Sequence, residues 1–225
     1  MATYMLIHGA GSDSWYWHLV VPELGARGHD VVAVDLPCED DSAGLRDYAD
    51  AVVRAVGGRS KLILVAQSLA GFTAPLVCER LPVALLVLVN AMVPRPGESA
   101  GEWWTNTGHV FPDPFDPVAV FLHDVAPDVA TEAANHVRRQ SDTVFGEPWP
   151  LAAWPQVPTR VLLCQDDRLF PAEFQRTVAR ERLGIVPDEM QGGHLPALAH
   201  PPRAGAATRG VQSFDRGASS RVTHR

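Results

Sequence analysis

The sequence predicts an α/β fold in which helices cover both faces of a mostly parallel sheet. Short apolar runs alternate with helical patterns over residues 3–90, and the alternation resumes after residue 158. Such alternation builds parallel strands joined by right-handed crossovers. Residues 91–158 interrupt the rhythm with many prolines and aromatic residues. We expect one domain over residues 1–200 with an insertion at 91–158.

Composition excludes several classes of protein. The 225 residues carry a formal net charge of −7, which gives no electrostatic footprint for nucleic acid. Three cysteines at unrelated spacings argue against a disulfide framework and against a zinc site. The sequence contains no metal-ligand cluster or phosphate-binding loop, so we expect no metal and no organic cofactor. No signal peptide and no apolar run of membrane-spanning length are visible, which predicts a cytoplasmic protein with no membrane partner.

The apolar and helical patterns place the elements in order. Strands are expected at residues 4–8, 30–35, 62–67, 83–89 and 159–164, and residues 188–190 lead into a Gly-Gly-His turn. Helices are expected at residues 15–26, 45–56, 69–80, 126–139 and 172–182. Asp13 or Ser14 can cap the first of these helices, and Gly28 ends it.

The central feature of the chain is the stretch around Ser68. A buried apolar strand stops at Ala66-Gln67-Ser68-Leu69-Ala70, and a helical pattern starts at once. A serine on a sharp strand-to-helix turn has its Oγ raised above the sheet edge, and the positions two residues away must be small. Here they are Ala66 and Ala70. The alternative is a serine that merely caps a helix.

The insertion at residues 91–158 has the composition of a lid over a pocket. Its aromatic content argues against a linker or a disordered segment. A packed helical excursion with no role in binding is the alternative.

Residues 201–225 are rich in Gly, Ala, Ser and Arg, and we expect them to form an irregular tail.

A nucleophilic serine needs a base and a group that orients the base. In a parallel sheet such groups come from loops at the carboxyl ends of strands. Asp166 and Asp167 follow one strand, and His194 follows the last one. We favour Asp167 as the acid because Pro171 lies four residues further on. Asp166 can instead cap the turn or pair with Arg168.

The first strand-to-helix loop, His8-Gly9-Ala10-Gly11, is the candidate second half of an oxyanion hole. We expect the backbone N–H groups of Ala10 and Leu69 to donate to the oxyanion. His8 itself is expected to be a structural hydrogen-bonding residue. Trp15 and Trp17 follow this loop and are candidates for the pocket wall or for the core.

Together these motifs resemble the α/β-hydrolase superfamily, and their spacing is similar to the branch of plant methylesterases and hydroxynitrile lyases. The resemblance covers residues 3–200 and rests on the glycine loop with its tryptophans, the Ser68 elbow, the Asp167 turn and the Gly-Gly-His194 turn. It implies the α/β-hydrolase fold, a Ser68–His194–Asp167 triad and an acyl-enzyme mechanism.

Several positions depart from the family pattern. Ala66-Gln67 stands where the family often has Gly-His. Hydroxynitrile lyases carry a lysine where this chain has Leu195 and a threonine where it has Gly9. These two differences make a lyase a less favoured interpretation. The tail supplies no good amphipathic helix after His194. We therefore expect the protein to be marginally stable or to form a homodimer.

We therefore expect a serine hydrolase that acts on a small, fairly apolar carboxylic ester, thioester or lactone. Two alternatives stay open. A lyase or other non-hydrolytic enzyme on the same site predicts proton transfer without a covalent acyl-enzyme. A receptor-like protein predicts tight ligand binding with little turnover and with signalling partners.

Overall fold

The computed structural model, which describes residues 1–201, contains a six-stranded sheet in which all neighbouring strands are parallel. The strand order is β2-β1-β3-β4-β5-β6. The strands are β1 (Thr3–Ile7), β2 (Asp30–Val34), β3 (Leu62–Gln67), β4 (Val83–Val89), β5 (Thr159–Cys164) and β6 (Asp188–Met190). The predicted parallel sheet is confirmed, and residues 188–190 add a strand at its edge.

Helices connect the strands. Those of the sheet framework are η1 (Ser14–Trp17), α1 (Val20–Gly25), α2 (Leu45–Val56), α3 (Ala70–Cys78), α8 (Ala172–Leu183) and α9 (Pro196–Ala199). Those between β4 and β5 are α4 (Ala100–Asn106), α5 (Pro117–Phe121), α6 (Pro127–Ala133), η2 (Ala134–His136) and α7 (Thr143–Gly146). None of the helices within residues 1–201 is both long and apolar enough to span a membrane.

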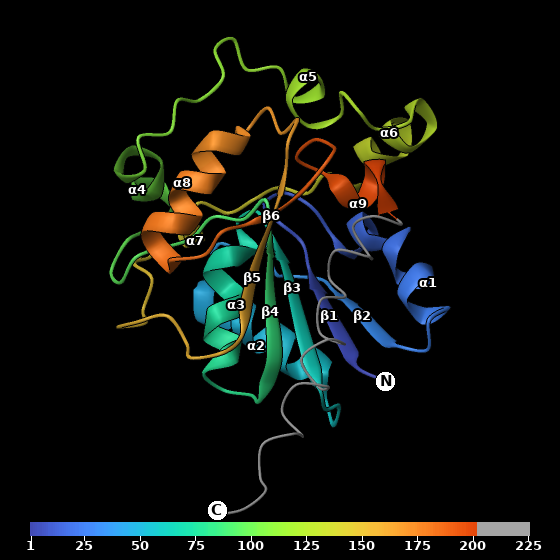
Figure 1. Ribbon diagram of the computed structural model, residues 1–225, viewed down its shortest axis with the longest axis vertical. Helices are drawn as coiled ribbons and strands as arrows, with labels where there is room; N and C mark the ends of the chain where they lie inside the picture. The colour runs from blue at the N-terminus through green and yellow to red at the C-terminus, as the bar shows by residue number, and fades with distance from the viewer. Residues whose placement is uncertain (202–225) are drawn as a thin grey trace, which may run out of the picture.

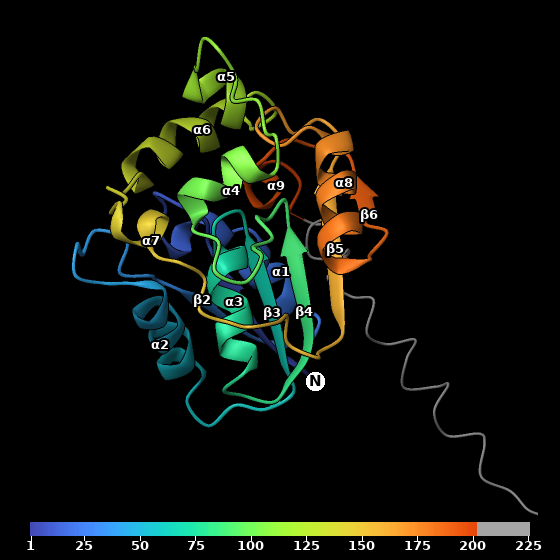
Figure 2. The same cartoon turned by 90° about the vertical axis from the view of Figure 1, so that its left-hand side faces the viewer.

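The core lies in two layers because alternate strand residues face opposite sides of the sheet. In β1, Met5 and Ile7 belong to the apolar cluster that also contains residues of α2, α3 and α8, whereas Tyr4 and Leu6 belong to the cluster that contains residues of η1, α1 and α9. Figures 1 and 2 show α2 and α3 on one side of the sheet and α1 on the other. Both faces are therefore covered, as the continuous apolar strands predict.

The helix expected at residues 15–26 is wrong as a single element. The chain forms η1, then a break at His18, and then α1. Pro22 has no N–H to donate to the carbonyl of His18, so an unbroken α-helical ladder cannot cross this point. Asp13 caps η1 by accepting from the N–H of Trp15.

The insertion, residues 91–158, lies beyond the carboxyl ends of the strands, where α4, α5 and α6 gather (Figure 2). The helix expected at 126–139 ends earlier, as α6 and η2. The chain then turns extended, and Arg138 donates its N–H to the carbonyl of Gly11 at 3.0 Å. A long-range contact with the first loop therefore replaces the last helical turns.

The strand order leaves a crevice at one place on the sheet. The chain runs from β1 to β2 on one side and then returns to β3 on the other, so the loops after β1 and β3 diverge. Ligands of open parallel sheets bind at such a switch point.

Lys61, the only lysine of the sequence, lies at the opposite edge, where its carbonyl accepts from the N–H of Thr3. The tail expected at 201–225 lies, apart from residue 201, outside the described residues.

Candidate active site

Ser68 occupies the turn between β3 and α3 with φ of 52°, a left-handed conformation that costs a non-glycine residue about 1–3 kcal/mol. Ala66 and Ala70 flank it, and both are fully buried. A Cβ on Gly71 would lie 1.8 Å from the carbonyl oxygen of Met92. Close packing therefore requires the glycine at position 71, and the turn has the geometry of a nucleophile elbow.

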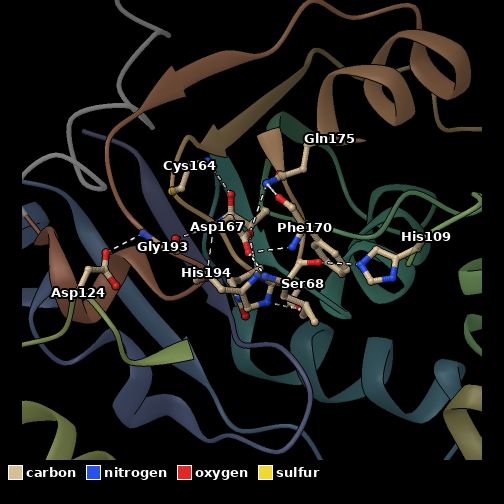
Figure 3. A network of polar contacts seen from close by, with 12 residues as sticks. Ser68, His109, Asp124, Cys164, Asp167, Phe170, Gln175, Gly193 and His194 are labelled. Atoms are coloured by element: carbon tan, nitrogen blue, oxygen red, sulfur yellow. Dashed lines mark hydrogen bonds and ion pairs between the residues drawn. The ribbon is translucent and has the colours of Figure 1, made fainter. Parts of the chain in front are cut away.

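The structure brings the three polar residues predicted from the sequence together (Figure 3). Nε2 of His194 lies 3.2 Å from Oγ of Ser68, and Nδ1 of His194 lies 2.8 Å from Oδ2 of Asp167. With the Nδ1 proton donated to the carboxylate, the lone pair of Nε2 faces the serine hydroxyl. The side chains of His194 and Asp167 are 3% and 0% exposed, so bulk water does not compete with their hydrogen bond.

The aspartate that contacts His194 is Asp167, whereas Asp166 is exposed and accepts from the N–H of Gly192 at 3.2 Å. Oδ1 of Asp167 accepts from the N–H groups of Leu169 and Phe170, each at 2.9 Å. Oδ2 also accepts from Nε2 of Gln175 at 3.3 Å (Figure 3). Four donors therefore fix the orientation of the carboxylate beside the imidazole. Asp166 instead ties the two loops together.

The turn that carries Asp167 is also held by the insertion. Nε2 of His109 donates to the carbonyl of Leu169 at 2.6 Å (Figure 3). Arg168 reaches the carbonyl of Ala119 at 2.8 Å, not Asp166. Both contacts join residues far apart in the sequence, so no local pattern announces them.

Two residues anchor the backbone of His194 from the sheet. Asn90 donates through Nδ2 to the carbonyls of Gly193 at 3.1 Å and His194 at 3.3 Å, and its Oδ1 accepts from the N–H of Cys164 at 2.8 Å. Gln67 donates to the carbonyl of His194 at 3.2 Å. Sequence reasoning assigned neither role. The only signals were a polar residue at the end of each of two apolar strands.

The loop after β1 approaches Ser68 closely. A Cβ on Gly9 would lie 2.8 Å from Cβ of Ser68, which explains the glycine. Within residues 1–201, neither the N–H of Ala10 nor that of Leu69 has a hydrogen-bond acceptor. Both are therefore available to an oxyanion beside Ser68.

His8 supports this loop. Its Nδ1 donates to the carbonyl of Gly9 at 2.8 Å, and its Nε2 accepts from the N–H of Leu36 at 3.2 Å. Burial lowers the pKa of His8 below its ordinary value, so the imidazole stays neutral and can make both contacts. The expected structural role of His8 is confirmed.

An apolar cavity of about 500 Å³ opens above Ser68. Trp15 and Tyr16 form part of its wall, whereas Trp17 is buried in the core. The insertion supplies much of the rest, namely Met92, Trp104, Phe111, Pro117, Val118, Phe121, Leu122, Ala133, Ala134, His136, Val137 and Phe145. Among the described lining residues there is no Asp, Glu, Lys or Arg. The cavity therefore suits an uncharged, apolar group.

The three cysteines do not belong to this site. All three are buried, and burial raises the pKa of Cys78 and of Cys164 to about 12. Within residues 1–201, no three His, Cys, Asp or Glu side chains are grouped to hold a metal ion.

Comparison with known proteins gives one family. Residues 5–208 match the model of the Alpha/beta hydrolase family. Methylesterase 7 of Arabidopsis thaliana is 30% identical over 158 residues, which are 64% of this chain and 52% of the relative. Polyneuridine aldehyde esterase of Rauvolfia serpentina is 23% identical over 242 residues, 88% of this chain and 90% of the relative.

The fold has solved counterparts. The crystal structure of a pyrethroid hydrolase from Sphingobium faniae JZ-2 superimposes with a TM-score of 0.76 and 23% identity, and the match covers 96% of this chain and 98% of the other.

Proposed function

Because the chain belongs to the Alpha/beta hydrolase family, we propose that it hydrolyses a small, uncharged carboxylic ester by way of an acyl-enzyme on Ser68. One observation carries the proposal: Oγ of Ser68, at a strained elbow, lies 3.2 Å from the imidazole of His194, which in turn contacts Asp167 at 2.8 Å. A serine in this setting loses its proton to the histidine as it attacks a carbonyl carbon.

The proposed reaction proceeds in two halves. Nε2 of His194 takes the proton of Ser68 Oγ while Oγ attacks the ester, and the N–H groups of Ala10 and Leu69 hold the oxyanion. The imidazolium then gives its proton to the leaving alcohol. Water, activated by the same nitrogen, attacks the acyl-enzyme and releases the acid. Asp167 stabilises the imidazolium throughout without accepting its proton.

The cavity supports an apolar substrate. It has no Asp, Glu, Lys or Arg among its described lining residues, and burying an unpaired substrate charge against such a wall is costly. The insertion forms much of this wall, which supports its role as a lid. The names of the relatives, a methylesterase, an aldehyde esterase and a pyrethroid hydrolase, are consistent with cleavage of carboxylic esters.

The proposal is tested with a fluorophosphonate, which labels only an activated serine. Intact mass and peptide mapping are expected to find one adduct, on Ser68, in the unmodified protein and none in His194→Ala. Ser42→Ala changes an exposed serine in the loop after β2 and is expected to label normally. A folded protein that takes up no adduct on Ser68 contradicts the proposal.

A panel of esters tests the substrate class. We expect neutral short and medium acyl esters to be cleaved, and the matching esters with an added carboxylate or ammonium group to have kcat/KM at least about tenfold lower, the factor given by 1.4 kcal/mol. Equal rates for neutral and charged esters would contradict the assignment of the cavity.

A further inference from the structure

The backbone just before His194 is packed against a dipeptide of the insertion, His123-Asp124. A Cβ on Gly193 would lie 2.7 Å from Oδ1 of Asp124 and 2.7 Å from Nε2 of His123. Gly192 has φ of 126°, and a Cβ there would lie 2.6 Å from the ring of His200. Gly193 therefore lets the insertion approach the base-bearing loop to van der Waals distance, and Gly192 does the same for the ring of His200.

Asp124 holds this loop by a hydrogen bond. Its Oδ2 accepts from the N–H of Gly193 at 2.6 Å (Figure 3). The other anchors of the loop come from the sheet and its loops: Asn90, Gln67 and Asp166. Within the described part of the chain, Asp124 is the only residue of the insertion whose side chain hydrogen-bonds residues 192–194.

The placement of Asp124 is not explained by stability alone. Its Oδ1 is shielded from solvent and has no hydrogen-bond partner within residues 1–201, and the same is true of Nε2 of His123. Nε2 of His200 lies 3.5 Å from Oδ2, so this contact reaches the oxygen that already accepts from Gly193 and leaves Oδ1 without a donor. A buried carboxylate oxygen without a donor disfavours folding, and such groups in native proteins call for a functional reason.

We propose that Asp124 is a positioning residue for the general base: by accepting from Gly193 it fixes the backbone that sets the 3.2 Å distance between His194 and Ser68. The insertion would then align the base as well as forming the pocket wall. This inference rests on the proposed serine chemistry. Misalignment of His194 affects its distance to Ser68 and leaves the wall of the cavity unchanged, so it should act on kcat and not on KM.

The experiment compares Asp124→Ala, Asp124→Asn and the control Asp128→Ala, which removes an exposed carboxylate on α6. Asp124→Ala is expected to lower kcat and the fluorophosphonate labelling rate by about 10- to 100-fold, because a misplacement of 1 Å costs about that much. KM is expected to stay nearly unchanged. Asp124→Asn keeps an oxygen acceptor for Gly193 and is expected to restore most of the rate. Asp128→Ala is expected to match the unmodified protein.

A spectroscopic readout separates positioning from stability. The Nδ1 proton of His194, shared with Asp167, gives a downfield proton NMR signal while the imidazole is held. Well below the melting temperature, this signal is expected to broaden in Asp124→Ala and to persist in Asp124→Asn. A role limited to stability would lower the melting temperature and leave the signal and kcat unchanged.

The outcomes also separate this inference from the proposed function. An unmodified protein that does not label on Ser68 overturns the proposed function. A protein that labels normally, with Asp124→Ala labelling equally fast and showing the same NMR signal, overturns only the positioning role. If Asp124→Ala does not fold, Gly193→Ala takes its place, because the new Cβ displaces Asp124. This variant is expected to label more slowly than the unmodified protein. Normal labelling of Gly193→Ala overturns the positioning role.

Discussion

The carboxylate of Asp167 accepts from Nδ1 of His194 at 2.8 Å, while the adjacent carboxylate of Asp166 accepts from the backbone of Gly192. Two neighbouring aspartates of one turn therefore have separate structural roles. The first is buried beside the imidazole, and the second is exposed.

This separation predicts unequal effects of removing each charge. Asp167→Asn is expected to lower kcat/KM by about 10³-fold or more, because the amide cannot stabilise the imidazolium and favours the wrong tautomer of His194. Asp166→Asn is expected to cost less than about tenfold, since it alters a loop contact only. Steady-state kinetics on one ester measures both. The opposite order would assign the acid role to Asp166.

Ser68 and His194 are expected to act as a unit. Ser68→Ala and His194→Ala should each lower kcat by about 10³-fold or more, and the double variant should be little worse than either single variant. The measurement is kcat for the three purified variants. Multiplicative losses would show that the two residues act independently, and turnover retained in Ser68→Ala would exclude an acyl-enzyme.

His8 is expected to make stability depend on pH. Burial lowers its pKa in the folded protein, whereas in the unfolded chain it titrates near pH 6.5. Below that pH the unfolded state binds a proton that the folded state excludes. The stabilisation is therefore present above about pH 6.5 and is lost as the pH falls through it.

Urea unfolding of the unmodified protein and of His8→Gln at pH 8, 6.5 and 5 measures this effect. The free energy of unfolding of the unmodified protein is expected to fall more steeply towards pH 5 than that of the variant. Parallel curves for the two proteins would show that His8 contributes nothing to the pH dependence.

Glu98 of the insertion and Arg182 of α8 form an ion pair in which both side chains are less than 5% exposed. Burial raises the pKa of Glu98, but hydrogen bonds from Arg182, Asn106 and the N–H of Arg95 outweigh it, and the net pKa is lowered. The pair therefore stabilises the fold above about pH 4.5, and this contribution is lost as the pH falls further.

Breaking this pair from one side should be costly. Glu98→Gln and Arg182→Met are each expected to lower the free energy of unfolding by about 3–5 kcal/mol at pH 7, because one charge is left buried alone. The exposed pair of Arg80 and Asp50 is the control, and Arg80→Met should cost about 1 kcal/mol or less. Thermal unfolding of the variants measures both, and equal losses at the two sites would contradict the prediction.

Gly71 and Gly25 give a matched test of packing at the elbow. Gly71→Ala would place a methyl group 1.8 Å from the carbonyl of Met92 and is expected to destabilise the protein by about 1–3 kcal/mol or more. At Gly25, the last residue of α1, nothing lies within 4 Å of the new methyl group, so Gly25→Ala should be neutral or slightly stabilising. Denaturant unfolding compares them.

Local signals were sufficient for much of the framework. The helix expected at 45–56 forms with those bounds, because its apolar face repeats at helical spacing and glycines stand at both ends. The Ser68 turn follows from steric need, since a Cβ at Gly71 would collide with the carbonyl of Met92. These features depend on neighbours in sequence, which a single chain displays directly.

What the sequence does not display are partners from distant segments. Asn90, Gln67 and Asp124 all bind the loop of His194, yet each lies about 70 or more residues away from it. The helix at 126–139 shortens for the same reason, because Arg138 finds its partner at Gly11. The break at His18 is different: Pro22 was visible, and its missing N–H is a local signal that the predicted helix overlooked.

The position of Lys61 has a practical consequence for assays on solid supports. Its ammonium group is the only side-chain primary amine of the sequence, and it is exposed at the edge of the sheet opposite the Ser68 turn. Coupling through this side chain to an activated resin or sensor surface would hold the molecule by the edge opposite the Ser68 turn. The mouth of the pocket would then face the flowing solution, so immobilised enzyme should turn over substrate as freely as dissolved enzyme does.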